Sequence, residues 1–308
     1  MTKNRGCLIE EMSMFNGLSA FPLTPMNEAG IDETAFKKIM ARLVKANVNS
    51  LGVLGSTGSY AYLTRAERKR VLEVAIDSAG SIPVIAGIGA LRTRHILELA
   101  EDAQKAGASA VLLAPVSYQK LTGEEVFTLY REVSSNLSVP MCVYDNPGTT
   151  HFTFSDELHA RIAQLPNVAS IKIPGVPADP ELARARVDKL KSLIPAGVSV
   201  GVSGDAFAAL GMNAGCDLWY SVIGGIFPEV CQQIIRLSES EDPALAIEQS
   251  EKLQPLWALF SQYGSLRVVA SIAHKIGLTD ETNLPKPLLS LKGVQENAAI
   301  DKVITLLS

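Results

Sequence analysis

The sequence predicts one α/β chain, a closed (β/α)8 TIM barrel with a C-terminal helical extension. Short apolar or β-branched runs alternate with longer helical patterns, eight such runs occur, and their starts lie roughly 20 to 33 residues apart. That spacing accommodates a strand, a crossover helix and two loops. A closed parallel barrel is the simplest arrangement of eight such units, and a doubly wound open sheet is the alternative.

The predicted strands and helices have recognisable ends. Thr64 with Glu67, and Thr122 with Glu125, read as capping boxes that open helices, and a glycine at Gly107 is typical of a helix C-cap. The predicted strands are Leu18–Phe21, Ser50–Leu54, Pro83–Ala86, Ala110–Leu113, Pro140–Tyr144, Val168–Lys172, Val198–Ser203 and Leu218–Val222.

Beyond Phe227 the pattern is only helical. We therefore divide the chain into an N-terminal tail (1–13), the barrel (14–227) and a C-terminal helical extension (228–308). Apolar residues recur at helical spacing in the extension and are expected to pack against the barrel or another subunit. The helices predicted there are Glu229–Glu239, Pro243–Tyr263, Ser265–Ile276 and Gly293–Leu307.

Composition excludes several classes of protein. The 308 residues are 47% hydrophobic and 19% charged with a net charge of −4, which is typical of a globular chain without a basic stripe for nucleic acid. No apolar run has the length of a signal peptide or a membrane span, so we predict a cytoplasmic protein that binds no membrane. The four cysteines form no Cys-x-x-Cys pair, and the four histidines have no metal-ligand spacing.

Two reactive side chains end neighbouring predicted strands. Lys172 follows the apolar run 168–171, and Tyr144 ends the preceding strand before the turn-forming residues 145–148. Because the carboxyl ends of parallel strands meet at one end of a barrel, the two side chains are expected to lie together. Each one alone would be an ordinary solvated lysine or an ordinary strand aromatic.

A glycine-rich loop after the second strand is the third motif. Gly55 and Gly58 flank Ser56 and Thr57, so hydroxyls and backbone N–H groups can converge on a carboxylate. A phosphate cradle is the competing interpretation, although the Gly-Lys-Ser/Thr ending of a P-loop is absent. An ordinary tight turn is the third possibility.

The three motifs together resemble those of the dihydrodipicolinate synthase and N-acetylneuraminate lyase family, Schiff-base-forming class I aldolases built on a (β/α)8 barrel. Gly55–Gly58 is similar to the family's pyruvate-binding loop, Tyr144–Pro147 to its tyrosine motif and Ser170–Lys172 to its lysine motif. The resemblance also places Gly204 in a loop beneath the imine and Tyr220 in the pocket wall.

The resemblance covers about residues 15–277 and has departures. Ser59 stands where the family usually has a glutamate. Ser117 takes the place of one of two paired tyrosines, one of which reaches a neighbouring subunit's site, and Tyr118 follows it. Thr149 stands where true synthases carry an arginine that binds the carboxylate of the second substrate.

The resemblance implies a mechanism. Lys172 would attack the ketone of pyruvate or another 2-oxo acid, and the iminium would act as an electron sink for carbon–carbon bond formation or cleavage. Tyr144 would transfer protons with Ser56 as a relay, and Thr57 would hold the carboxylate. No metal or other cofactor is needed. The predicted site comprises catalytic Lys172, Tyr144 and Ser56, and substrate-binding Gly55, Thr57, Gly58, Ser117, Tyr118, Thr149, Gly204 and Tyr220.

We therefore predict a Schiff-base-forming lyase whose partners are small 2-oxo acids and aldehydes, with a second substrate other than aspartate semialdehyde. An authentic 4-hydroxy-tetrahydrodipicolinate synthase is the first alternative. A barrel enzyme that grips a phosphate with Gly201–Gly204 and Gly224–Gly225 is the second, and a non-catalytic family member is the third. The resemblance further implies a homo-oligomer, a dimer or a homotetramer.

Overall fold

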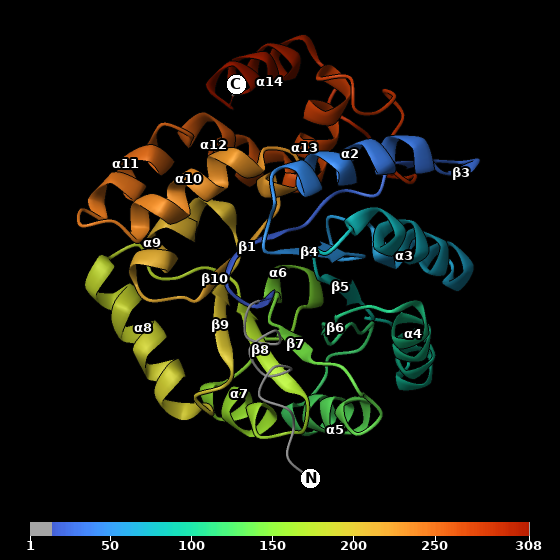
Figure 1. Cartoon of the computed structure of the whole chain (residues 1–308), viewed down its shortest axis with the longest axis vertical. Coiled ribbons are helices and arrows are strands. Elements are labelled where there is room, and N and C mark those ends of the chain that lie inside the picture. The colour runs from blue at the N-terminus through green and yellow to red at the C-terminus, as the bar shows by residue number, and fades with distance from the viewer. Residues whose placement is uncertain (1–13, 308) are drawn as a thin grey trace.

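Eight parallel strands close into a barrel in the computed structural model, which describes residues 14–307 (Figure 1). Strands adjacent in sequence pair in space, and β1 closes the ring against both β4 and β10. The (β/α)8 prediction is confirmed, and each predicted strand end lies within one residue of the observed end. The strands are β1 (Gly17–Ala20), β4 (Ser50–Val53), β5 (Val84–Gly87), β6 (Ala110–Leu113), β7 (Met141–Tyr144), β8 (Val168–Ile173), β9 (Ser199–Val202) and β10 (Leu218–Ser221).

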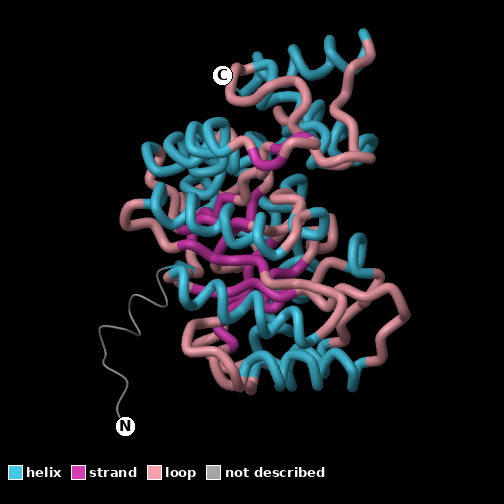
Figure 2. Tube along the Cα trace, turned by 90° about the vertical axis from the view of Figure 1, so that its right-hand side faces the viewer, coloured by secondary structure: helices cyan, strands magenta, loops and turns pink. Residues whose placement is uncertain are grey.

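Helices surround the strands, which form the centre of the molecule in both views (Figures 1 and 2). Between the barrel strands, and after the last of them, lie α2 (Glu33–Lys45), α3 (Arg65–Ala79), α4 (Thr93–Ala106), α5 (Gly123–Ser134), α6 (Pro147–Thr150), α7 (Asp156–Ala163), α8 (Pro180–Leu193), α9 (Ala208–Asn213) and α10 (Pro228–Ser238). A short hairpin of β2 (Met26–Asn27) and β3 (Gly30–Ile31) precedes α2. Single 3-10 turns are η1 (Tyr60–Tyr62), η2 (Asp205–Phe207) and η3 (Ile223–Gly225).

Alternation along the strands divides the core into two layers. Successive side chains of a strand point to opposite faces, so one set fills the barrel and the other packs under the helices. On β7, Cys142 and Tyr144 belong to the small inner cluster, whereas Val143 belongs to the large outer one. On β8, Ile171 joins the outer cluster. Lys172, the next residue, therefore faces the barrel interior.

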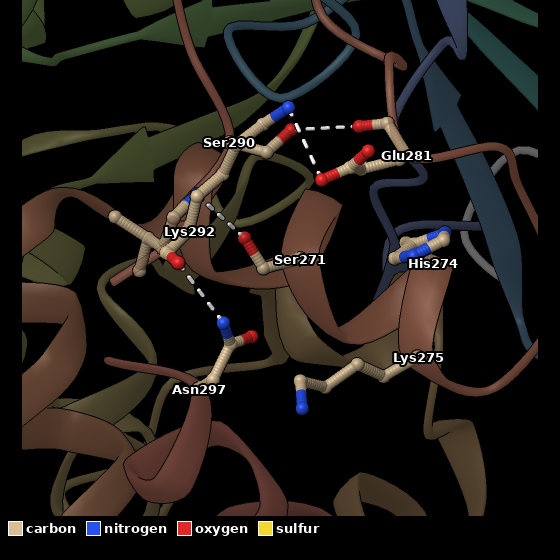
Figure 3. Close-up of a pocket in the computed structure, with 8 residues that line it drawn as sticks. Ser271, His274, Lys275, Glu281, Ser290, Lys292 and Asn297 are labelled. Atoms are coloured by element: carbon tan, nitrogen blue, oxygen red, sulfur yellow. Dashed lines mark hydrogen bonds and ion pairs between the residues drawn. The ribbon is translucent and has the colours of Figure 1, made fainter. Parts of the chain in front are cut away.

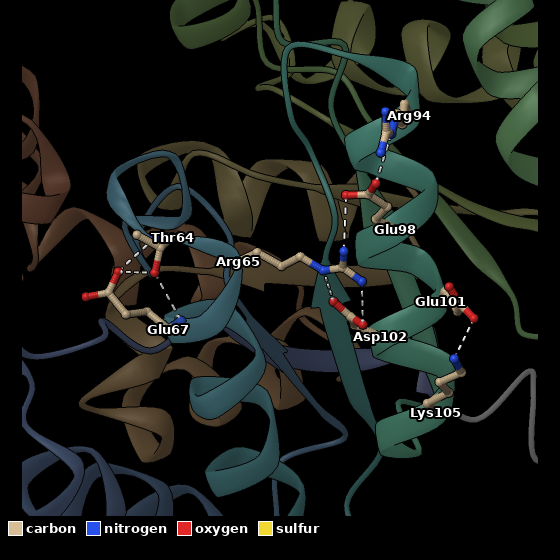
Figure 4. A network of polar contacts seen from close by, with 8 residues as sticks. All are labelled: Thr64, Arg65, Glu67, Arg94, Glu98, Glu101, Asp102 and Lys105. Atoms are coloured by element: carbon tan, nitrogen blue, oxygen red, sulfur yellow. Dashed lines mark hydrogen bonds and ion pairs between the residues drawn. The ribbon is translucent and has the colours of Figure 1, made fainter.

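Local signals position the helices as expected. Both predicted capping boxes are present, at Thr64 with Glu67 and at Thr122 with Glu125. Gly107 ends α4 at φ +93°, a left-handed conformation that favours glycine. Figure 4 shows the first box beside an exposed ion-pair network, in which Arg65 of α3 donates to Glu98 and Asp102 of α4. Exposed pairs of this kind contribute about 1 kcal/mol or less, so burial of the helices dominates.

The C-terminal helices lie to one side of the barrel, near α2 and α10 (Figure 1). They are α11 (Ala244–Glu251), α12 (Gln254–Tyr263), α13 (Ser265–Lys275) and α14 (Val294–Leu307). The single helix predicted for 243–263 is wrong, because the chain breaks between α11 and α12. Pro255 lies in the first turn of α12 and has no N–H to continue a preceding helix.

The division of the chain at residue 227 stays a prediction. The helix α10 begins directly after this boundary and contacts elements on both sides of it. This helix follows β10, packs on β1 and α9, and also contacts α11 extensively. The predicted tail, 1–13, lies outside the described residues. Within 14–307, no helix combines the length and apolar character needed to cross a membrane.

Candidate active site

Lys172 lies in an aromatic cage at the carboxyl end of β8. Its Nζ is 3.8 Å from the ring centroid of Phe21, 4.2 Å from that of Tyr144 and 5.4 Å from that of Tyr220. The side chain is only 4% exposed, and no carboxylate among residues 14–307 forms an ion pair with it. Ring faces attract a cation without forming an ion pair with it. The amine is therefore enclosed by three rings and held by no carboxylate of the described residues.

Tyr144 is the direct neighbour of Lys172 across the sheet. The two Cα positions are partners in the β7–β8 register, and the backbone N–H of Asp145 donates to Lys172 O at 3.0 Å. The Tyr144 hydroxyl accepts a hydrogen bond from Asn146 Nδ2 at 2.8 Å. Asn146 is the N-cap residue of the short helix α6, so the turn after β7 itself orients the phenol.

Phe21 and Asn146 contact Lys172 and Tyr144, and the sequence did not identify either of them as a candidate site residue. The sequence placed Phe21 at a strand end as an ordinary apolar residue and treated Asn146 only as part of a turn. Asn146 carried one usable signal, an amide two residues after the proposed acid–base tyrosine. Phe21 carried none, because its contact with Lys172 depends on closure of the barrel.

The loop Gly55–Gly58 follows β4, and its glycines are required by packing. A Cβ at Gly55 would lie 2.9 Å from the Phe21 ring, and one at Gly58 would lie 2.9 Å from the backbone N of Leu54. Thr57 is 7% exposed, and Ser56 is half-buried. Neither hydroxyl forms a hydrogen bond within the described part of the chain. Both are therefore free to bind a ligand, but Ser56 is not hydrogen-bonded to Tyr144.

Tyr220 points its hydroxyl into the barrel core. The oxygen lies 2.6 Å from Ser170 Oγ and 3.2 Å from Cys142 Sγ, and its ring contacts Phe21 edge-on. Burial raises the pKa of Tyr220 well above its usual range. Its ring therefore contacts Lys172, whereas its hydroxyl is bonded to side chains of the barrel core.

Hydrogen bonds of one buried carboxyl group join the loops after β9 and β10. Gly204 adopts φ +79°, which favours glycine, and introduces a turn in which Asp205 is buried. The Asp205 carboxyl accepts from Trp219 Nε1 at 2.9 Å, Val222 N at 3.1 Å and Ile223 N at 2.7 Å. These bonds fix the loop of Gly204 to the end of β10.

Three predicted residues lie apart from the buried cage. Thr149 is exposed on α6, and its hydroxyl donates to Asn146 O at 3.4 Å. Ser117 donates to Gln119 O and helps to line a cavity of about 430 Å³ between α4, α5 and the loop after β6. Tyr118, at 91% exposure, projects from this loop into solvent.

A second cavity, of about 320 Å³, lies between α13, α14 and the loop that joins them (Figure 3). Its polar groups largely pair with one another: Lys292 with Glu281 at 3.1 Å, and Ser271 Oγ with the backbone N of Leu291 at 2.9 Å. No group of three or more His, Cys, Asp or Glu side chains in residues 14–307 could hold a metal ion.

A buried amine at the end of a barrel strand, with a phenol on the adjacent strand, is the arrangement of a Schiff-base-forming lyase of the class I aldolase type. Comparison with known proteins agrees. The chain belongs to the dihydrodipicolinate synthetase family, whose family model matches residues 14–305.

Individual relatives support the assignment. The chain is 32% identical over 278 residues to a 4-hydroxy-tetrahydrodipicolinate synthase of Phenylobacterium zucineum, covering 88% of this chain and 91% of the relative. A crystal structure of dihydrodipicolinate synthase from Agrobacterium tumefaciens is similar at TM-score 0.92 and 42% identity, covering 97% of this chain and all of that one. The dihydrodipicolinate synthase of Acinetobacter baumannii complexed with pyruvate matches at TM-score 0.85 and 27% identity, over 95% and 99% of the two chains. The chain is therefore an enzyme, a lyase of the class I aldolase type.

Proposed function

We propose that Lys172 forms an imine with pyruvate or a closely related 2-oxo acid, and that the enzyme uses this imine to make or break a carbon–carbon bond. The carrying observation is the buried Nζ of Lys172, enclosed by three aromatic rings and free of any ion pair in the described structure. The pyruvate complex of the Acinetobacter baumannii relative supports the choice of keto acid.

The proposed reaction assigns a task to each part of the site. The amine of Lys172 adds to the ketone to give a carbinolamine, which loses water to form the iminium. Tyr144 lies on the adjacent strand β7, where it is placed to deliver and accept the protons of these steps. Ser56, Thr57 and the adjacent loop amides hold the carboxylate, since both hydroxyls lack partners within residues 14–307.

Borohydride trapping tests the proposal. Pyruvate and borohydride should together add a reduced three-carbon adduct to Lys172, which peptide mass spectrometry will locate. Borohydride without pyruvate is the matched control. An unmodified Lys172, under conditions that trap a known class I aldolase, would contradict the proposed mechanism.

The phosphate-binding alternative has less support, because neighbouring groups occupy the space that a side chain at its glycines would need. A Cβ at Gly201 would lie 2.3 Å from the Tyr220 ring, and one at Gly225 would lie 2.6 Å from Phe21 O. These positions need glycine to let side chains and backbone approach closely. Packing thus accounts for the glycines without a phosphate.

For the second substrate we propose an aldehyde or sugar acid that lacks the carboxylate of aspartate semialdehyde. The position that bears arginine in true synthases is Thr149, an exposed residue whose hydroxyl donates to a backbone oxygen. A hydroxyl cannot replace a bidentate guanidinium, whose charge-assisted bonds contribute about 1.5 to 3 kcal/mol each. The names of the relatives keep the authentic synthase as the alternative.

Steady-state kinetics with pyruvate and aspartate semialdehyde will distinguish the two. We expect kcat/KM for the semialdehyde below about 10⁴ M⁻¹s⁻¹, the lower edge of the ordinary enzyme range. Thr149→Arg should raise this value about tenfold or more if the missing cation is the only obstacle, and Thr149→Lys is the matched control without a bidentate fork. A wild-type value above that limit would restore the synthase assignment.

We also propose a homo-oligomer whose contact includes the loop after β6. Tyr118 is 91% exposed and Leu91 is 66% exposed, and Leu91 and Ser117 line the same cavity of about 430 Å³. Large exposed apolar side chains that lie near one another are typical of an interface. Tyr118 would then meet the neighbouring subunit instead of its own site. The cytoplasmic location stays a prediction.

A further inference from the structure

A buried carboxyl–imidazole pair lies directly behind the proposed catalytic residues. Asp145 follows Tyr144, and its backbone N–H donates to Lys172 O at 3.0 Å. Its Oδ2 lies 3.5 Å from Nε2 of His159 on α7. Asp145 is 6% exposed, and His159 is fully buried. The proposed mechanism uses neither side chain.

The imidazole is held in one orientation. Its ring stacks on Phe154 at 4.8 Å with an interplanar angle of 3°, and Ser155 caps the helix that carries it. Asp145 Oδ1 and both ring nitrogens of His159 have no hydrogen-bond partner within the described residues. The 3.5 Å approach of Oδ2 to His159 Nε2 is therefore the only polar contact of the Asp145 side chain within residues 14–307.

The charged and titratable groups around the pair come from three helices. Arg186 of α8 forms an ion pair with Asp156 of α7 at 2.7 Å, beyond the imidazole. From α5, the Tyr130 hydroxyl donates to a backbone oxygen at 2.6 Å, and burial raises its pKa well above the usual range. None of these groups forms an ion pair with Asp145.

Burial determines the protonation of the pair. It raises the pKa of Asp145 to about 7, against a smaller lowering by Arg186. It lowers the pKa of His159 to about 4, helped by Arg186 and opposed by Asp156. Between about pH 4 and pH 7 the contact therefore joins a carboxylic acid to a neutral imidazole, and the pair carries no net charge.

We propose that Asp145 and His159 are positioning residues, and that their buried contact anchors the strand end that presents Tyr144. The inference rests on the proposed Schiff-base function. Loss of the Asp145 proton leaves a buried carboxylate beside a neutral ring, an arrangement that is relieved when the 144–146 segment shifts toward water. Tyr144 and Asn146 lie in that segment, whereas the carboxylate-binding loop Gly55–Gly58 does not. Turnover should depend on the proton, and pyruvate binding should not.

Kinetics of Asp145 variants provide the first test. Asp145→Ala should lower kcat about tenfold or more while KM for pyruvate and borohydride trapping of Lys172 stay within about twofold. Asp145→Asn should restore most of the turnover, because its amide keeps the shape of the acid and stays neutral beside the imidazole. Wild-type kcat should decline as pH rises through about 7, and Asp145→Asn should lack this decline. His151→Asn, at an exposed left-handed position, is the matched control and should behave as wild type.

Unfolding provides a second test that does not need activity. Folded Asp145 holds its proton up to about pH 7 and unfolded Asp145 only to about 4, so its contribution to stability falls as pH rises across that window. His159 is neutral when folded and binds a proton when unfolded between about pH 4 and 6.5, so its contribution rises. In the wild type, the pH dependences of these two contributions to stability oppose each other. The urea midpoint should therefore increase from pH 4.5 to 6.5 in Asp145→Asn and decrease in His159→Gln.

The outcomes separate the two proposals. If wild-type Lys172 fails to trap pyruvate, the proposed function fails, and opposite slopes in urea would still establish that the buried pair is uncharged in the folded protein. If trapping succeeds but Asp145→Ala keeps its kcat, or loses kcat and trapping together, the positioning role is overturned. Urea slopes of the same sign in the two variants would overturn the uncharged state of the pair on which the positioning role depends.

Discussion

Replacing Lys172 by methionine is expected to lower turnover by about 10⁴-fold or more and to abolish borohydride trapping, because the covalent route disappears with the amine. Methionine fills much of the same volume between the rings of Phe21, Tyr144 and Tyr220. The loss should therefore occur in a folded protein. Circular dichroism and the urea midpoint will verify the fold, and kcat will be measured with saturating pyruvate.

The stability of the Lys172→Met protein provides a second check that the amine acts in catalysis and not in folding. A buried cation without an ion pair is costly, although the ring faces offset part of the cost. We expect the Lys172→Met protein to be at least as stable as the wild type. Lys191→Met is a matched control, since Lys191 forms an ion pair with Asp217 away from the site. Residual turnover within tenfold of wild type would show that Lys172 is not the nucleophile.

Tyr144→Phe is expected to lower kcat by about 10²-fold or more while imine trapping persists, since a positioned acid–base group contributes roughly 10²- to 10⁴-fold. The ring that contacts Lys172 Nζ at 4.2 Å remains, and only the hydroxyl bonded to Asn146 is removed. Single-turnover measurements will separate imine formation from the later proton transfers.

Tyr220→Phe is the informative comparison for this variant. Its hydroxyl lies between Ser170 and Cys142 in the barrel core, so its removal should cost about 1 kcal/mol of stability and little turnover. If Tyr220→Phe loses turnover as severely as Tyr144→Phe, the acid–base role must be shared or reassigned.

The regular alternation of strand and helix patterns in the sequence was sufficient to predict the barrel. Eight apolar runs at crossover spacing allow few closed arrangements, and the alternation along β7 and β8 directs Tyr144 and Lys172 to the interior of neighbouring strands. The single helix predicted over 243–263 is wrong, since apolar periodicity continues through the segment whereas Pro255 cannot continue a preceding helix.

The amino-acid sequence by itself determined the strands, their order and the pair of reactive side chains, because these depend on periodicity and on residues close in the chain. Only the tertiary structure decided how the site is completed. Phe21 reaches Lys172, and His159 reaches Asp145, across helices and loops whose packing no local pattern encodes. Closure of the barrel also directed the Tyr220 hydroxyl into the core, since interior side chains from different strands compete for one enclosed volume.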